Sequence, residues 1–423
     1  MSSHSAPRVL SLACGALLVA LCVDTTLAEA PELDPPCAVR RAWSNHPTSQ
    51  ATEHTLAAAR ARAEAAGMPL YNPDLELAVD AEGDDRTTTA GLSLTLDLSG
   101  KRGARRALGS AEFDLAAAEA GHRRSSFARQ WLQASAEHRS ALARSTLGQR
   151  RLDLMQRFAD LAQRQFEAGD ISAPERDLAG LARDQAEAEQ ATLLAELAIA
   201  EEAFRALGGD PQTVRVAKDC PASAAWEASQ RFDPWQTPEG RIALASSQAA
   251  ERRVDSAGRD QRADPTVSIN AGRIEVGSAS DNVLALSVSV PLRFRNPYRA
   301  EVIAARAEAD ATLAEQARIE RELKARADRA LQSSMALDAA WRRWRAGPGS
   351  KLDERADLME RLWRAGELST ADYLAQLNQS LDTAFAGVDL QGRASRAQVD
   401  ALYATGRLDA WVGFDAPLSE NTP

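Results

Sequence analysis

The chain has 423 residues and a net charge of −10, and it is 44% hydrophobic but only 5% aromatic. Long stretches consist of Ala, Arg, Glu, Leu, Asp and Gln, which favours long helices over a compact sandwich or α/β fold. Arginine is interleaved with Glu and Asp rather than clustered, so nucleic acid is not an expected partner.

The N-terminal segment is typical of an export signal. The uncharged run Val9–Val23 follows a positively charged start, and Ala28-Glu29-Ala30 offers small residues for cleavage. The run is too short for a membrane span. A short buried helix is one alternative. A lipoprotein signal at Cys22 is another, but Leu21 is larger than the residue that usually precedes a lipidated cysteine. We predict that residues 1–30 are a signal peptide.

Two cysteines, Cys37 and Cys220, follow the predicted signal. Exported proteins meet an oxidising compartment, so a disulfide between Cys37 and Cys220 is one interpretation. Two unpaired buried thiols are the other, and the sequence does not choose between them.

The strongest organisational signal is an internal duplication. The segment Phe166–Ser172 (FEAGDIS) recurs as Trp363–Ser369 (WRAGELS), and Pro73, which opens a strand-like run, is matched by Pro265. These landmarks recur in the same order at nearly constant spacing, which chance similarity of Ala-rich helices does not produce. We predict a first repeat over 31–209, a linker over 210–236, a second repeat over 237–408 and a tail over 409–423.

Each repeat has the same predicted order of elements. A helix beginning near a proline comes first, then a pair of strands, then a long helical hairpin. The first helices are expected near 48–67 and 238–260, the strand pairs over about 73–99 and 265–292, and the hairpins over about 103–207 and 298–405.

The predicted strands alternate apolar and polar residues. Leu75, Leu77 and Val79 alternate with acidic or small residues, and the run Leu92–Leu98 repeats the pattern. Four strands cannot close a barrel alone, and an open sheet with an apolar face would aggregate. A barrel shared among chains, apolar outside and wet inside, fits the pattern. A soluble sheet packed on helices is the alternative.

The hairpins are expected to form coiled-coil walls, since small Ala residues allow close packing and Arg/Glu neighbours solvate the outer faces. The run from Gly103 to Ala168 contains no proline, and Gly169 supplies a helix end. The second hairpin differs, because Gly347-Pro348-Gly349 is expected to break or kink its outbound helix.

This order of elements resembles the TolC-type outer membrane factors of Gram-negative tripartite efflux systems. The segments Leu96–Arg102 (LDLSGKR) and Val290–Asn296 (VPLRFRN), which lead into the long helices, resemble motifs of the heavy-metal (CzcC-like) branch. The resemblance implies a mainly α fold with a small β part. Each chain of a homotrimer would give four strands to a twelve-stranded barrel in outer-membrane lipid, above an α-helical periplasmic tunnel.

The resemblance also implies gate residues. The family carries an acidic residue six positions after the turn glycine of the second hairpin, and Asp372 stands there, with Glu175 in the first copy. Trp363 matches an aromatic residue that helps to latch the gate. Ala375 and Leu368 replace a second acid and an arginine of the family, so the gate chemistry is expected to differ. The alternative for both acids is a solvated residue in the first turn of a helix.

The hairpin turns are the expected contacts for a periplasmic adaptor bound to an inner-membrane pump of the resistance-nodulation-division (RND) type. Simple turn geometry is the alternative, and both interpretations can hold. These turn residues are Gly169, Asp170, Ile171, Ser172, Gly366, Glu367, Leu368 and Ser369.

Catalysis has little support in the sequence. The five His residues are scattered, no Cys/His set has metal-ligand spacing, and no nucleophile motif has its partners. We expect no enzyme activity, cofactor or resident metal site. The leading hypothesis is a passive efflux duct for heavy-metal cations in the outer membrane. The alternatives are a duct for drugs or for type I secretion, and a periplasmic coiled-coil adaptor.

Overall fold

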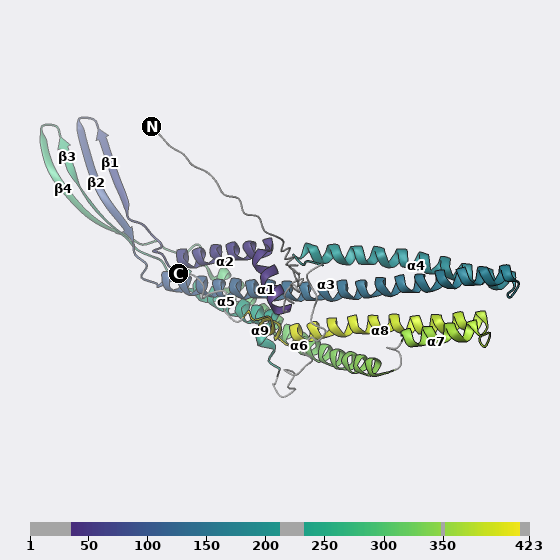
Figure 1. Cartoon of the computed structure of the whole chain (residues 1–423). Coiled ribbons are helices and arrows are strands. Elements are labelled where there is room, and N and C mark those ends of the chain that lie inside the picture. The colour runs from purple at the N-terminus through teal and green to yellow at the C-terminus, as the bar shows by residue number, and fades with distance from the viewer. Residues whose placement is uncertain (1–34, 212–231, 348–351, 415–423) are drawn as a thin grey trace, which may run out of the picture.

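The computed structural model describes residues 35–211, 232–347 and 352–414. The molecule is elongated, with a β-sheet at one end and the tips of two helical hairpins at the other (Figure 1). The predicted signal peptide, Cys220 and part of the predicted break at 347–349 lie outside the described residues, so the proposed disulfide stays a prediction.

The first repeat contains four helices and two strands in the predicted order. The helices near 48–67 and 238–260 are confirmed as α2 and α5. A further helix, α1, precedes α2, and the sequence reasoning missed it. The elements are α1 Pro35–Asn45, α2 Pro47–Ala66, β1 Asp74–Glu82, β2 Asp85–Thr95, α3 Lys101–Ala168 and α4 Ala173–Ala206.

The second repeat follows the same plan, with its outbound helix in two pieces. A short 3₁₀ helix stands where α1 stands in the first repeat. The elements are η1 Pro234–Gln236, α5 Pro238–Asp260, β3 Thr266–Val276, β4 Ala279–Ser289, α6 Arg299–Ala346, α7 Leu352–Arg364, α8 Thr370–Ala404 and α9 Leu408–Val412.

The four strands form one antiparallel sheet in the order β1-β2-β3-β4, so the two repeats meet where β2 pairs with β3. The register aligns Leu75, Leu92, Ile269 and Leu286 in one row across the sheet. The predicted apolar face is therefore confirmed, and none of the described helices covers it, since Leu77 is 74% exposed. The outer strands of the sheet, β1 and β4, each have an edge without a partner among the described strands.

The predicted extent of β2 is wrong at its end, because the strand stops at Thr95 rather than near Ser99. The Asp97 carboxylate accepts hydrogen bonds from the backbone N–H groups of Lys101 (2.9 Å) and Arg102 (2.7 Å). Those bonds turn the chain out of the sheet and cap the start of α3. Burial of Asp97 alone would raise its pKa, but these backbone donors lower it.

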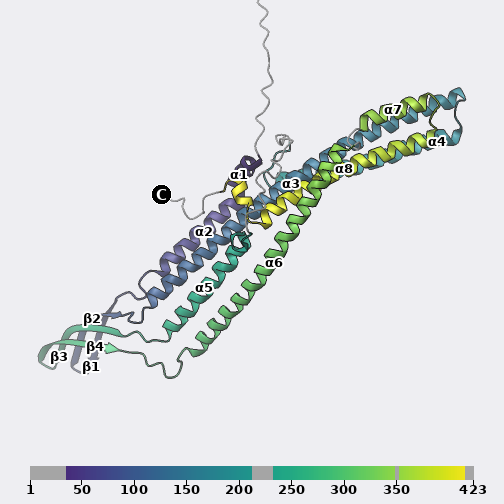
Figure 2. The same ribbon diagram turned by 90° about the horizontal axis from the view of Figure 1, so that it is seen from below.

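The long helices lie in the order α4-α3-α8-α6, with α7 continuing beside α8 toward the tips (Figure 1). Toward the sheet, α2, α3, α5 and α6 lie side by side (Figure 2). Two clusters of buried side chains hold them together. One joins both hairpins near the tips through Met155, Phe158, Trp363, Leu377 and other residues. The other joins α1, α3, α4, α8 and α9 midway along the molecule.

The predicted interruption of the second outbound helix is confirmed, since α6 ends at Ala346 and α7 begins at Leu352. Just before the interruption, the Trp344 ring lies against Gly387 of α8, where a Cβ would stand 2.0 Å from a ring atom. Trp341 stacks on Trp344 with ring centroids 5.3 Å apart. Trp344 therefore packs α6 against α8, and Trp341 supports its ring.

Candidate functional site: the hairpin tips and the sheet

The two hairpin tips have the same backbone. Gly169 and Gly366 both adopt left-handed conformations, with φ of 85° and 74°. Their N–H groups donate to the carbonyl oxygens of Phe166 and Trp363, both at 3.0 Å. A side chain at either glycine would be strained, so glycine at these turns is a geometric requirement.

Each return helix begins with a serine cap and an acid three residues later. Glu175 accepts hydrogen bonds from the backbone N–H and the hydroxyl of Ser172, at 2.8 and 2.7 Å. The Ser369 hydroxyl accepts from the Asp372 N–H at 3.1 Å and donates to the Asp372 carboxylate at 2.7 Å. The hydrogen bonds from Ser172 lower the pKa of Glu175. Glu175 thus helps to cap α4, whereas Ser369 caps α8 and Asp372 is bonded to its hydroxyl. That either acid faces a tunnel stays a prediction.

Trp363 is buried in the core of the second tip. Its ring stacks on Tyr373, with centroids 5.2 Å apart, and tilts against Phe158 at 4.7 Å. Its indole N–H donates to the Thr370 hydroxyl at 3.3 Å. Burial raises the pKa of Tyr373 to about 12. Trp363 therefore joins three helices, and its role as a gate latch stays a prediction.

The surface of the two tips is small and acidic. Ile171 and Leu368 turn back and pack against the apolar tip cluster. The remaining predicted contact residues of the turns are exposed: Gly169, Asp170, Ser172, Gly366, Glu367 and Ser369. In the first tip, the Arg176 guanidinium covers the Phe166 ring at 4.4 Å, where the second tip has its buried tryptophan.

A buried ion pair joins the repeats where the sheet meets the helices. Lys101 Nζ lies 2.7 Å from the Asp264 carboxylate, and both side chains are almost fully buried. The Tyr71 hydroxyl donates to the same carboxylate oxygen at 2.9 Å. The sequence reasoning missed this group. Lys101 was visible as one of only four lysines, but Asp264 lies 163 positions away in the sequence.

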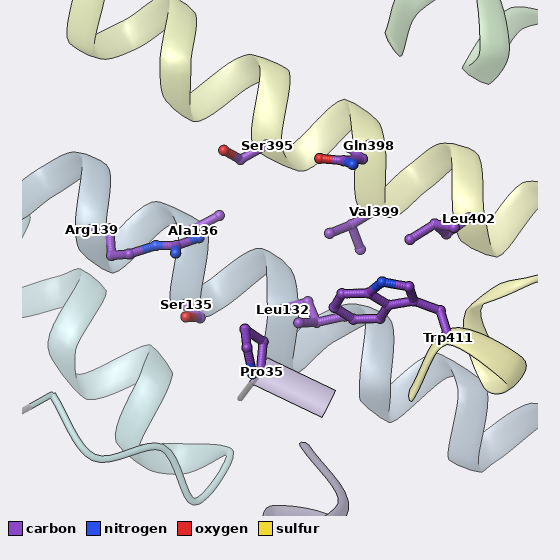
Figure 3. A pocket seen from close by; sticks show the side chains of 10 residues that line it. All are labelled: Pro35, Leu132, Ser135, Ala136, Arg139, Ser395, Gln398, Val399, Leu402 and Trp411. Carbon is purple, nitrogen blue, oxygen red and sulfur yellow. The ribbon is translucent and has the colours of Figure 1, made fainter. Parts of the chain in front are cut away.

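A cavity lies beside the mid-molecule cluster, where side chains from α1, α3, α8 and α9 meet (Figure 3). The Trp411 ring lies beside Val399 and Leu402 of α8, with Pro35 on its other side. The cavity has a volume of about 30 Å³, which is room for one water molecule. The cavity therefore offers no room for a cofactor.

Within residues 35–211, 232–347 and 352–414, no three His, Cys, Asp or Glu side chains are placed to hold a metal ion. In the same part of the chain, no helix is both long and apolar enough to cross a membrane.

Comparisons with known proteins give one consistent result. Residues 38–210 match the family model of outer membrane efflux proteins. The cobalt-zinc-cadmium resistance protein CzcC of Cupriavidus metallidurans is 27% identical over 225 residues, which cover 52% of this chain and 54% of CzcC. The chain thus spans about half the length of this curated relative.

Solved structures share the fold over most of the chain. The outer membrane protein VceC of Vibrio cholerae superposes with a TM-score of 0.70 at 16% identity, covering 88% of this chain and 96% of VceC. The outer membrane channel CmeC of Campylobacter jejuni gives 0.72 at 13% identity, covering 88% and 85%. These matches confirm the fold class expected from the sequence.

Proposed function

We propose that this chain, whose first repeat matches the family model of outer membrane efflux proteins, is one subunit of a passive exit duct. The duct would sit in the outer membrane of a Gram-negative bacterium and extend into the periplasm. At about 1.5 Å per residue, the 68 residues of α3 span about 100 Å, a length suited to a tunnel wall rather than to a globular core.

The sheet is the single observation that carries the proposal. One face presents rows of exposed Leu, Val and Ile, and the other presents mainly acidic, hydroxyl and small side chains, with Ile274, Val276 and Val283 as its larger apolar residues. A sheet with one apolar face toward lipid and one polar face toward water matches the wall of an outer-membrane barrel. With β1 and β4 both open, further copies of the chain can continue the sheet until it closes.

The helices support the same assembly. Because the helices run in the order α4-α3-α8-α6, α4 and α6 form the two edges of the protomer. Both edges expose apolar side chains, for example Leu181 and Ile199 on α4 and Ile303 and Met335 on α6. A head-to-tail ring in which α4 of one copy meets α6 of the next would cover both edges. Three copies would bring twelve strands together.

We propose divalent metal cations as the cargo. CzcC is named a cobalt-zinc-cadmium resistance protein. The register also separates the basic residues of the four strands from the polar face: Arg86 and Arg273 lie on the apolar face together with Glu275, and the polar face of these strands has no basic residue. A wall of one sign raises the local concentration of counter-ions. The carboxylates on the polar face are Asp74, Glu76, Asp80, Glu82, Asp85 and Asp281.

The tips are the proposed contact for a periplasmic adaptor, and an inner-membrane pump would supply the energy. Both tips present the same glycine-acid-aliphatic-serine turn, so one kind of partner surface can engage both. In a threefold ring, Asp372 and Glu175 would each form a ring of three carboxylates near the entrance. This arrangement would attract cations and let the gate be held by charge.

Conductance in planar lipid bilayers tests the proposal. The purified protein should form pores that prefer K⁺ to Cl⁻, and Asp372→Ala should weaken their block by Zn²⁺. Asp357→Ala, at an exposed acid of α7, is the control. A protein that forms no pores contradicts the duct. An anion-selective pore contradicts the cation cargo, and unchanged block in Asp372→Ala removes that residue from the entrance.

A further inference from the structure

Two arginines of α3 tie the two hairpins of the protomer together, which bears on how the proposed duct opens. Arg144 lies 3.6 Å from Glu196 of α4 and 3.2 Å from Asp389 of α8. It also lies 3.0 Å from Glu137 of its own helix. One guanidinium therefore joins α3 to the return helices of both repeats.

Arg151 repeats the arrangement two turns closer to the tips. It lies 2.9 Å from Glu189 of α4 and 3.6 Å from Asp382 of α8. It also donates to the side-chain oxygen of Asn378 at 3.0 Å. The planar guanidinium carries five donors, so one arginine can hold partners on two helices, which a lysine cannot do as well.

The two groups form a regular ladder. The arginines are seven residues apart on α3, as are their glutamates on α4 and their aspartates on α8. Seven residues return to the same face of a packed helix. One step above, Glu137 pairs with Arg396 of α8. One step below, the corresponding residues Phe158, Ala182 and Ala375 carry no charge, and Phe158 and Ala182 pack in the apolar tip cluster.

The arginines are well shielded from solvent. The side chain of Arg144 is 19% exposed and that of Arg151 is 10% exposed. Ion pairs with a shielded partner are screened less by salt than those on an open surface. The ladder is therefore a stronger connection than the many surface pairs along α6.

We propose that Arg144 and Arg151 clamp α8 to α3, so that the two hairpins of each protomer move as one body above Asp382. Separation of the hairpins during opening is then confined to the tip section below the ladder, where apolar side chains join α3 to α8. The clamp rests on the proposed duct, and it assigns both arginines a positioning role rather than contact with the cargo.

The test compares pore conductance in variants of the full chain. Arg144→Met/Arg151→Met should raise single-channel conductance several-fold, because α8 can then part from α3 higher along the tunnel. Arg157→Met is the matched control, since this exposed α3 arginine donates to a backbone oxygen of its own helix. Arg144→Lys/Arg151→Lys keeps the charge but loses the planar guanidinium that binds partners on two helices, so it should give an intermediate rise in conductance. This variant also covers the case in which the Met variant does not fold.

An engineered disulfide between α3 and α8 tests whether the conductance rise comes from the parting of these two helices or from a general loss of rigidity. A Cβ built at Gly392 lies 3.1 Å from the Cβ of Ser140 on α3, above both arginines. Ser140→Cys/Gly392→Cys, in a chain with Cys37 and Cys220 changed to Ser, should form this link after a small shift. Oxidation should return the double-Met variant toward wild-type conductance.

Each failure has its own signature. A wild-type protein that conducts nothing contradicts the duct itself. A wild-type protein that conducts, with folded arginine variants at unchanged conductance, overturns the clamp. Raised conductance that the oxidised link leaves unchanged also overturns it, because the rise would then come from movements other than the parting of α3 and α8.

Discussion

The helices α3 and α6 hold the same place in the two repeats but have opposite surroundings. α3 buries side chains along its whole length, whereas α6 buries only Val302, Ala305, Ala309, Leu323 and Ala327 among its described residues. The cause is position, since α3 lies between α4 and α8 and α6 lies at the edge. In this duplicated chain, the second copy of the long helix is the one left at an edge, where the proposed ring would cover it.

The two junctions where the sheet leads into a long helix also differ between the repeats. Gly100 enters α3 with φ of 71°, and Tyr298 enters α6 with φ of 55°, so a bulky residue holds a conformation that suits glycine. The first junction is fixed by the buried Lys101–Asp264 pair. At the second, the Arg293 guanidinium covers the Tyr298 ring at 4.7 Å. One junction is thus held by a buried charge pair and the other by a strained aromatic residue.

The largest expected effect comes from breaking the first junction. Lys101→Met leaves the buried Asp264 carboxylate without its counter-charge and should lower the free energy of unfolding by about 3–5 kcal/mol. Denaturant unfolding of the purified protein measures this loss. Lys101→Met/Asp264→Leu should recover most of it. The exposed pair of Lys324 with Glu320 is the control, because Lys324→Met should cost no more than about 0.5 kcal/mol.

The contrast between buried and edge positions can be tested with one substitution at each. Leu377 of α8 is fully buried in the tip cluster, so Leu377→Ala should cost about 2–5 kcal/mol of unfolding free energy. Met335 of α6 is 64% exposed, so Met335→Ala should leave the protomer's stability nearly unchanged. Native mass spectrometry should show a weakened trimer for Met335→Ala. Equal losses of protomer stability in both variants would contradict the contrast.

Relieving the second junction should stabilise the chain. Tyr298→Gly removes a left-handed strain of about 1–2 kcal/mol and loses a cation–π contact of about 0.5–1 kcal/mol. The net gain should be small and positive, whereas Gly100→Ala at the first junction should be destabilising. Thermal unfolding of both variants measures whether each change raises or lowers the stability. A destabilised Tyr298→Gly would show that the aromatic contact outweighs the strain.

The smallest expected effect concerns the first tip at low pH. The folded-state pKa of Glu175 lies below its ordinary value of 4.5, because the ionised carboxylate accepts two hydrogen bonds from Ser172. Its stabilisation is therefore present above pH 4.5 and is lost as the pH falls through the lowered pKa. Amide exchange at Ser172 should speed up over that window. Glu175→Gln should abolish the pH dependence, and a variant with an unchanged profile would assign it to another group.

Much of the fold followed from the sequence because the duplication doubled every local signal. Prolines marked the starts of α2 and α5, and period-two alternation marked the strands. Gly169 and Gly366 marked the turns, where only a left-handed residue fits. The break after Ala346 followed from glycine and proline alone. These features depend on neighbours in the chain, so one sequence is enough to predict them.

The contacts between distant segments did not follow. Lys101 meets Asp264, and Arg144 meets Asp389, only because the two repeats fold against each other, and no local pattern records those pairings. Trp363 was predicted from the resemblance as a gate residue, but its burial against Tyr373 depends on the packing of three helices. The end of β2 was missed because the Asp97 cap acts against the alternation that continues to Leu98.

The assembly of the chain is the central claim, and crosslinking after cell fractionation tests it most directly. The full-length protein, expressed in a Gram-negative host, should be recovered with the outer membrane and crosslink to a species of three chains. Leu181→Asp on the α4 edge should reduce that species, whereas Glu187→Asp at an exposed polar position should not. A monomer in the soluble periplasm would contradict the duct.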